Sequence, residues 1–329
     1  MALRILFIGE IVGRAGIFCI KSMLPALKQE LKPDFVIANG DGATGGFGLG
    51  KNHAIYLRKL GIDVLTSGDQ IYFKKDMVEH IERAPYILRP ANFPQADPGR
   101  GWRFYSVATA VPAADAAMVE GAAVSEQPNV PPAENPDQGT AATTERLAVP
   151  SPHRRREALP GTKTIAVISL LGQSGFSRTH LGNPFIHLPE LVTRIRHETS
   201  IIILDFHAVT TAEKSTMFYH ADGLVSAVLG SGTRIVTADA DVLPGGTAVI
   251  SDTGRTGSLN SVSGLDPSIE IQKFLTQIPE RSKDGWDNLE LQGVVLDIGD
   301  DGKATRIEMI RRPCTDVPNR VPDERNGGD

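Results

Sequence analysis

The chain has 329 residues, enough for one large domain or two of ordinary size. Its composition, with 41% hydrophobic and 22% charged residues, is typical of a globular protein with a buried core. The net charge of -5 disfavours a general binder of duplex DNA, which needs clustered cations. The chain contains two cysteines, which excludes a disulfide scaffold and favours the cytoplasm, and no apolar run reaches the roughly 20 residues of a membrane span.

Strand and helix patterns alternate through the first 90 residues. Short apolar runs predict buried strands, and stretches with helical spacing follow each of them. The expected strands are 3–8, 34–39 and 62–66, and the expected helices are 17–31, 52–60 and 74–83. A Gly-rich loop at 40–50 and a polar loop at 68–70 separate these elements. This alternation predicts an α/β fold.

The middle of the chain differs in composition. Strands are expected at 102–109 and 164–171, and the residues between them are rich in Ala, Pro, Glu and Ser. Residues 110–162 contain too few long apolar side chains to offset the entropy of ordering, so we predict a disordered insertion. Its basic run at 154–156 suits contact with an unknown protein or nucleic acid, although a solvated linker is the simpler interpretation.

The second half resumes the α/β pattern. Strands are expected at 201–206, 225–229, 248–250 and 291–298, with a helix at 268–275. The Pro-rich, polar tail 311–329 is expected to be flexible. The predicted organisation is a single domain formed by residues 1–109 and 163–310.

Polar side chains follow several of the predicted strands. Glu10, Asp41, Asp69 and His207 each come just after such a strand. Ligand sites in open α/β sheets form at the carboxyl ends of the strands, so these side chains are expected to converge. Carboxylates that converge repel one another unless a cation lies among them, and oxygen ligands with an imidazole suit Mg, Mn, Fe or Zn.

Each of these residues also has a simpler explanation when taken alone. A Glu after a strand is often a helix cap or a surface charge, an Asp in a Gly-rich loop is often a turn former, and a single His is often packed in a core. The glycines of residues 9–16 lie between a strand and a helix, but they lack the G-x-G-x-x-G spacing of a dinucleotide site.

Taken together, these segments resemble the YmdB-type metallophosphoesterases, which are calcineurin-like phosphodiesterases associated with cyclic-nucleotide hydrolysis. The resemblance covers residues 3–109 and 163–310 and implies a four-layer α/β/β/α sandwich with a two-metal phosphoesterase site. The motifs that carry it are IGEIVG at 8–13, NGDGATGG at 39–46, GDQ at 68–70, RPAN at 89–92, PGRG at 98–101, DFHA at 205–208, TAD at 237–239 and LPGGT at 243–247.

The sequence departs from the family pattern at nearly every metal ligand. The family has an Asp after the first strand, a Glu-Asn pair, an Asn-His pair, a later His and a Gly-x-His-x-His motif. The matching positions here are Glu10, Asp41 with Gly42, Asp69 with Gln70, His207, and Gly232 with Arg234. The resemblance therefore implies Glu10, Asp41, Asp69 and His207 as metal ligands, with Gln70 and Arg234 at altered catalytic positions.

Two hypotheses follow from these departures. In the first, the protein is a degenerate family member with weak or no phosphodiesterase activity, which binds a phosphate or nucleotide or acts as a scaffold. An arginine cannot ligate a metal but can occupy the place of one, so Arg234 is expected to replace the cation nearer Glu10. In the second, the protein is an active phosphodiesterase that uses one divalent metal or an altered pair. The resemblance also makes a homo-oligomer an expectation, and no membrane partner is expected.

Overall fold

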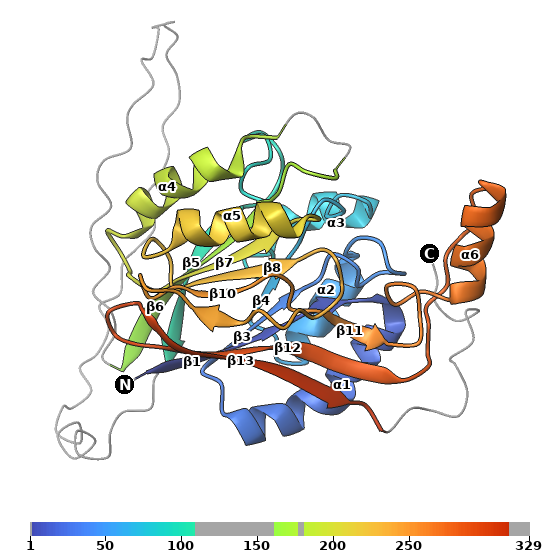
Figure 1. Ribbon diagram of the computed structural model, residues 1–329, viewed down its shortest axis with the longest axis horizontal. Coiled ribbons are helices and arrows are strands. Elements are labelled where there is room, and N and C mark those ends of the chain that lie inside the picture. The colour runs from blue at the N-terminus through green and yellow to red at the C-terminus, as the bar shows by residue number, and fades with distance from the viewer. Residues whose placement is uncertain (1, 109–160, 177–180, 316–329) are drawn as a thin grey trace, which may run out of the picture.

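The computed structural model describes residues 2–108, 161–176 and 181–315. Two β-sheets lie face to face, and helices cover the outer face of each sheet (Figure 1). The predicted four-layer α/β/β/α sandwich is therefore confirmed.

The first sheet has seven strands and is built around the N-terminal strand. Its central strands β1, β3 and β4 are parallel, whereas β12 runs antiparallel to β1 and also pairs with β11 and β13. Its strands are β1 (Leu3–Ile8), β2 (Glu10–Ile11), β3 (Phe35–Asn39), β4 (Val64–Thr66), β11 (Arg255–Ser258), β12 (Leu289–Ile298) and β13 (Ala304–Pro313).

The second sheet has six strands in the order β5-β6-β7-β8-β10-β9. Its four central strands β6, β7, β8 and β10 are parallel, and the edge strands β5 and β9 are antiparallel to their neighbours. Its strands are β5 (Trp102–Ala108), β6 (Thr162–Leu171), β7 (Ile202–His207), β8 (Ala227–Ser231), β9 (Asp241–Val242) and β10 (Ala248–Ile250).

Helices α1, α2 and α3 pack on the first sheet, and α4 and α5 pack on the second (Figure 1). The sixth helix, α6, projects from the body of the molecule. The helices are α1 (Gly13–Leu31), α2 (Lys51–Lys59), α3 (Lys75–His80) with the 3₁₀ turn Ile81–Arg83, α4 (Pro184–Ile195), α5 (Thr211–Ala221) and α6 (Pro267–Thr276). Among the helices described, none is long and apolar enough to cross a membrane.

The core consists of three apolar layers, one at each junction between the four structural layers. Side chains alternate between the two faces of a strand, so β1 directs Leu6 and Ile8 toward α1 and directs Ile5 and Phe7 toward the second sheet. The third layer joins the second sheet to α4 and α5 and includes Phe206. Both faces of each central strand are buried, which explains the continuous apolar runs in the sequence.

Most expected elements are present with ends shifted by a few residues, but the expected flexible tail is wrong at its start. Residues 311–313 belong to β13, and Cys314 is buried. The Arg311 guanidinium lies 2.6 Å from Glu290 Oε1 on β12, and this ion pair connects the end of β13 to β12. Residues 109–160 and 316–329, with most of the expected insertion, its basic run and the rest of the tail, lie outside the described residues.

Candidate functional site

A cavity of about 330 Å³ lies where the carboxyl ends of strands from both sheets meet. All six residues singled out in the sequence line it. The lining residues are Glu10, Asp41, Phe47, Asp69, Gln70, Gly175, Phe176, His207, Gly232, Thr233, Arg234 and Ser263. The fold therefore brings together the side chains that were expected to converge.

Asp41 is buried and is held by the loop that follows β4. The Gly68 N–H donates to its Oδ1 at 2.7 Å, and the Gln70 N–H donates to its Oδ2 at 3.2 Å. The Asp41 N–H donates to the Asn39 side chain at 3.0 Å. This loop also carries Asp69, so these contacts fix the separation of the two carboxylates.

A hydrogen-bond chain orients the imidazole of His207 at the end of β7. The Ser231 hydroxyl donates to Asp205 Oδ1 at 2.6 Å, and its oxygen lies 3.0 Å from His207 Nδ1. Because the serine proton is directed to Asp205, Ser231 accepts from Nδ1, which places a proton there. Nε2 then faces the cavity, 3.5 Å from Asp69 Oδ1 and 3.8 Å from Asp41 Oδ2.

The buried charges perturb one another strongly. Burial raises the pKa of Asp41 to about 7, and the neighbouring carboxylates of Glu10 and Asp69 add to this rise while His207 opposes it. Burial by itself would lower the pKa of His207, but the contact with Asp69 and the charges of Asp41 and Glu10 raise it to about 9. Without a cation, the cluster therefore holds protons that an exposed site would release.

Asp41, Asp69 and His207 each offer one ligand atom, and these atoms lie within 4.8 Å of one another. In the part of the chain that the structure describes, no other three His, Cys, Asp or Glu residues are grouped in this way. Two carboxylates and an imidazole suit Mn, Fe, Zn or Mg. The donor set, the oriented His207 and the raised pKa of Asp41 all fit a divalent cation at this point.

Glu10 lies beside this group and contacts Arg234. Arg234 Nε donates to Glu10 Oε1 at 2.8 Å, and Nη2 lies 2.7 Å from the same oxygen. The guanidinium also donates to the carbonyls of Gly46, at 2.8 Å, and Ser263, at 3.3 Å. The Oε2 atom of Glu10 is buried with no hydrogen-bond partner among the described residues. The role of Glu10 as a metal ligand stays a prediction.

Gly42 makes room for this ion pair. A Cβ atom at position 42 would lie 2.8 Å from Arg234 Nη2 and 2.9 Å from Glu10 Oε1, closer than such atoms approach in proteins. The two positions at which the resemblance implies a changed residue, 42 and 234, therefore lie in direct steric contact. The sequence showed each change but gave no sign that they touch.

Three further residues complete the site and were missed by the sequence reasoning. The ring of Phe176 stacks on His207 with centroids 6.0 Å apart and planes inclined by 25°, and Phe47 also lines the cavity. Ser231 orients His207, and its place at the end of β8 was the one signal that could have identified it. The Oε1 atom of Gln70 is buried and has no partner among the described residues.

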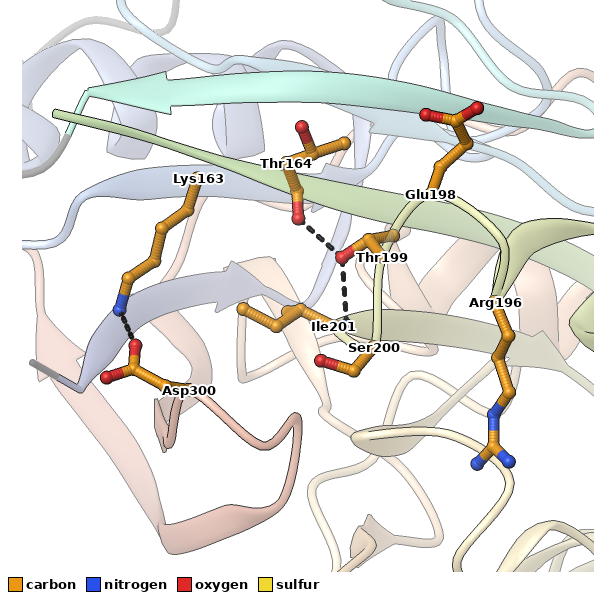
Figure 2. Close-up of a pocket in the computed structure, with 8 residues that line it drawn as sticks. All are labelled: Lys163, Thr164, Arg196, Glu198, Thr199, Ser200, Ile201 and Asp300. Atoms are coloured by element: carbon orange, nitrogen blue, oxygen red, sulfur yellow. Dashed lines mark hydrogen bonds and ion pairs between the residues drawn. The ribbon is translucent and has the colours of Figure 1, made fainter. Parts of the chain in front are cut away.

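Figure 2 shows a second cavity, of about 390 Å³, at the opposite, amino-terminal ends of β6 and β7. Lys163 pairs with Asp300 across it at 2.5 Å, and the Thr199 hydroxyl donates to the Thr164 carbonyl at 2.6 Å. Its lining residues include none of the three that could hold a metal. The shape of this cavity alone does not make it a reaction site.

Comparison with known proteins agrees with the geometry. A family model described as YmdB-like protein matches residues 6–132 and 155–310. The 2′,3′-cyclic-nucleotide 2′-phosphodiesterase of Bacillus subtilis is 33% identical over 309 residues, which are 94% of this chain and 96% of that protein.

Two solved structures share the fold. A phosphatase from Mycoplasma pneumoniae has a TM-score of 0.73 and 25% identity, with 95% of this chain and 94% of that chain covered. A hypothetical protein from Thermus thermophilus has a TM-score of 0.72 and 23% identity over 94% of this chain and 99% of that chain. The chain belongs to the YmdB-like family and has its metallophosphoesterase-type fold.

Proposed function

We propose that the protein is a divergent metallophosphoesterase that binds one divalent cation at Asp41, Asp69 and His207 and has weak or no phosphodiesterase activity. The guanidinium of Arg234 takes the place of a second cation beside Glu10. The observation that carries this proposal is the buried contact between Arg234 and Glu10 in the space left by Gly42. A guanidinium has five donors and no lone pair for a metal, so it supplies positive charge without ligation.

The residues of the site define what chemistry it can support. A divalent cation bound there would polarise a phosphoryl oxygen and lower the pKa of a bound water. Arg234 faces the same cavity and can orient an anionic phosphoryl group and stabilise its charge. Gln70 stands where the family resemblance places a catalytic His, and its amide can donate a hydrogen bond but has no titratable proton to transfer. These residues therefore support phosphoester binding, and the rate of hydrolysis is what the experiment below must measure.

The alternative is an active phosphodiesterase that works with one cation. The close approach of Asp41, Asp69 and His207 favours it, because their ligand atoms are close enough together to hold one cation. The activity named for the Bacillus subtilis relative makes a 2′,3′-cyclic nucleotide the substrate class to test. In this alternative Arg234 would compensate for the second cation in the transition state.

Metal content and turnover of the same samples separate these proposals. The protein is loaded with Mn²⁺, its metal per chain is measured by elemental analysis, and hydrolysis of 2′,3′-cyclic AMP and bis(4-nitrophenyl) phosphate is followed. H207A is compared with H197A, because His197 is exposed and lies outside the cavity. One ion that is lost in H207A, with turnover near background, is the expected result.

The remaining outcomes are equally informative. Turnover comparable with that of an intact relative, and dependent on His207, would replace the degenerate proposal by the one-cation enzyme. Two ions per chain would contradict the role given to Arg234. No bound ion would contradict the cation site and leave Arg234 as the resident positive charge.

A further inference from the structure

The side chain of Lys214 on α5 is buried away from the cavity. It is 1% exposed, and its Nζ lies 2.8 Å from Oδ2 of Asp252, which is equally buried. Neither residue lines the cavity. A buried ion pair contributes little to stability compared with apolar residues of the same volume, and its best-attested use is to specify one arrangement of the chain. The contacts of Asp252 show which arrangement that is.

Asp252 connects Lys214 to both partners of the ion pair in the cavity. Its Oδ2 accepts from the Thr233 N–H at 3.0 Å and from the Thr233 hydroxyl at 2.7 Å, directly beside Arg234. Its Oδ1 accepts from the Gly254 N–H at 2.9 Å, and the Gly254 carbonyl accepts from the Glu10 N–H at 2.9 Å. One carboxylate thus holds the backbone on both sides of the contact between Glu10 and Arg234.

The backbone of Arg234 needs such support. Its φ is 60°, in the left-handed region that residues other than glycine seldom adopt. A conformation of this kind persists where the surroundings fix it. The Thr233 contacts fix it from one side, and Nη1 of the buried Arg255 donates to the Arg234 carbonyl at 2.7 Å from the other.

We propose that Lys214 is a positioning residue that acts through Asp252 and Thr233 to keep Arg234 against Glu10. This inference rests on the proposed function, in which Arg234 replaces a cation. When Lys214 is lost, Arg234 leaves Glu10, so the cavity gains a free carboxylate and loses a positive charge. Both changes favour the binding of a metal cation in the cavity. A variant of a residue outside the cavity thereby tightens metal binding, whereas general damage to the site would weaken it.

The first experiment is a double-mutant cycle on Mn²⁺ affinity, measured by calorimetry for K214M, R234Q and the double variant. R234Q is expected to tighten binding about tenfold by removing a like charge near the ligands. K214M is expected to tighten it in the same direction and to add nothing in the R234Q background. K28M is the matched control, because Lys28 Nζ donates to the Gly61 carbonyl at 2.6 Å and lies outside the cavity.

The second experiment observes Arg234 directly. In the wild-type protein its Nε–H signal in a ¹⁵N spectrum, identified by its absence in R234Q, should exchange slowly because Glu10 accepts from it. K214M should abolish that protection, and K28M should keep it. T233V removes the hydroxyl contact to Asp252 and takes the place of K214M if that variant does not fold.

The outcomes separate failure of this inference from failure of the proposed function. If R234Q leaves Mn²⁺ affinity unchanged, the role proposed for Arg234 as a cation is wrong, and the Nε–H signal then decides the inference alone. If R234Q tightens binding while K214M weakens it by the same factor in both backgrounds, Lys214 only supports the fold and the inference is overturned. A protected Nε–H signal in both K214M and T233V would also overturn it.

Discussion

Both halves of the cavity contain carboxylates, but the negative charge is balanced in a different way in each half. In one half, Glu10 is bonded to Arg234, whose remaining donors reach the carbonyls of Gly46 and Ser263. In the other half, Asp41 and Asp69 face the Nε2 of His207 at distances longer than a hydrogen bond. The first half carries a fixed counter-charge, the guanidinium, whereas the positive charge of the second half is a proton on His207 that a metal cation can displace. In the proposed function, Arg234 therefore replaces one cation while the ligands of the other stay in place.

The largest effect is expected from H207A, which removes the imidazole from the half that is proposed to bind the metal cation. Loss of a metal ligand should weaken Mn²⁺ binding by at least about 100-fold, more than loss of a supporting residue does. Calorimetric titration of H207A against H197A measures it. If H207A binds Mn²⁺ as tightly as the wild type, the cation does not sit at this group and the comparison of the two halves is wrong.

A smaller effect is expected from S231A, which leaves His207 in place but removes the acceptor of its Nδ1–H. Such a change should weaken Mn²⁺ binding by about 10- to 100-fold, because the imidazole loses its fixed orientation. The matched control is S226A, since Ser226 is buried directly before β8, at the other end of this strand from Ser231, and its hydroxyl accepts from the Ile202 N–H at 3.0 Å, away from the cavity. Equal losses of affinity in both variants would show that only fold stability is at stake.

The half that carries its own counter-charge is tested by G42A. The added methyl group would crowd Arg234 and Glu10 and should lower the free energy of unfolding by about 1–3 kcal/mol. G40A is the control, because a Cβ atom there meets Leu49 at 3.4 Å, an ordinary contact. Urea denaturation measures both variants.

The steric coupling itself is tested by repeating the experiment in an R234A background. With the guanidinium gone, G42A should cost less than it does in the wild type, although the contacts with Glu10 Oε1 and the Ile11 carbonyl remain. If G42A lowers the free energy of unfolding equally in both backgrounds, Arg234 does not limit the size of the side chain at position 42. The two halves would then differ for another reason.

The sequence predicted the architecture well where a local pattern carries the signal. Apolar runs identified the buried strands, and acids after those runs identified the cavity, because parallel strands end at one edge of a sheet. Helix α4 was missed because Pro184 and Pro189 suggest breaks, although Pro184 occupies the first turn, where proline is tolerated, and Asn183 caps the helix. Strand β13 was missed because its exposed face is charged, as is common at a sheet edge.

What could not be predicted depends on contacts between distant segments. The displacement of a cation by Arg234 was expected from the side-chain chemistry, and the structure places this residue beside Glu10. Two features depend on short distances between residues that are far apart in the chain. They are the space that Gly42 provides and the link from Lys214 through Asp252 to Thr233. No periodicity or motif encodes such a distance.

Mn²⁺ affinity is also expected to change with pH, by about tenfold for each pH unit, and this again distinguishes the two halves. In the metal-free protein the pKa of His207 is raised to about 9, so between pH 7 and 9 a cation must displace a proton from the imidazole. The affinity should therefore rise about tenfold per pH unit over this range and level off above pH 9. Below pH 7 the dependence should steepen, because Asp41, whose pKa is about 7, then binds a proton as well. Arg234 stays protonated throughout this range, so it contributes nothing to the slope. Calorimetry at several pH values measures the slope, and an affinity that does not change between pH 7 and 9 would show that the cation does not use His207.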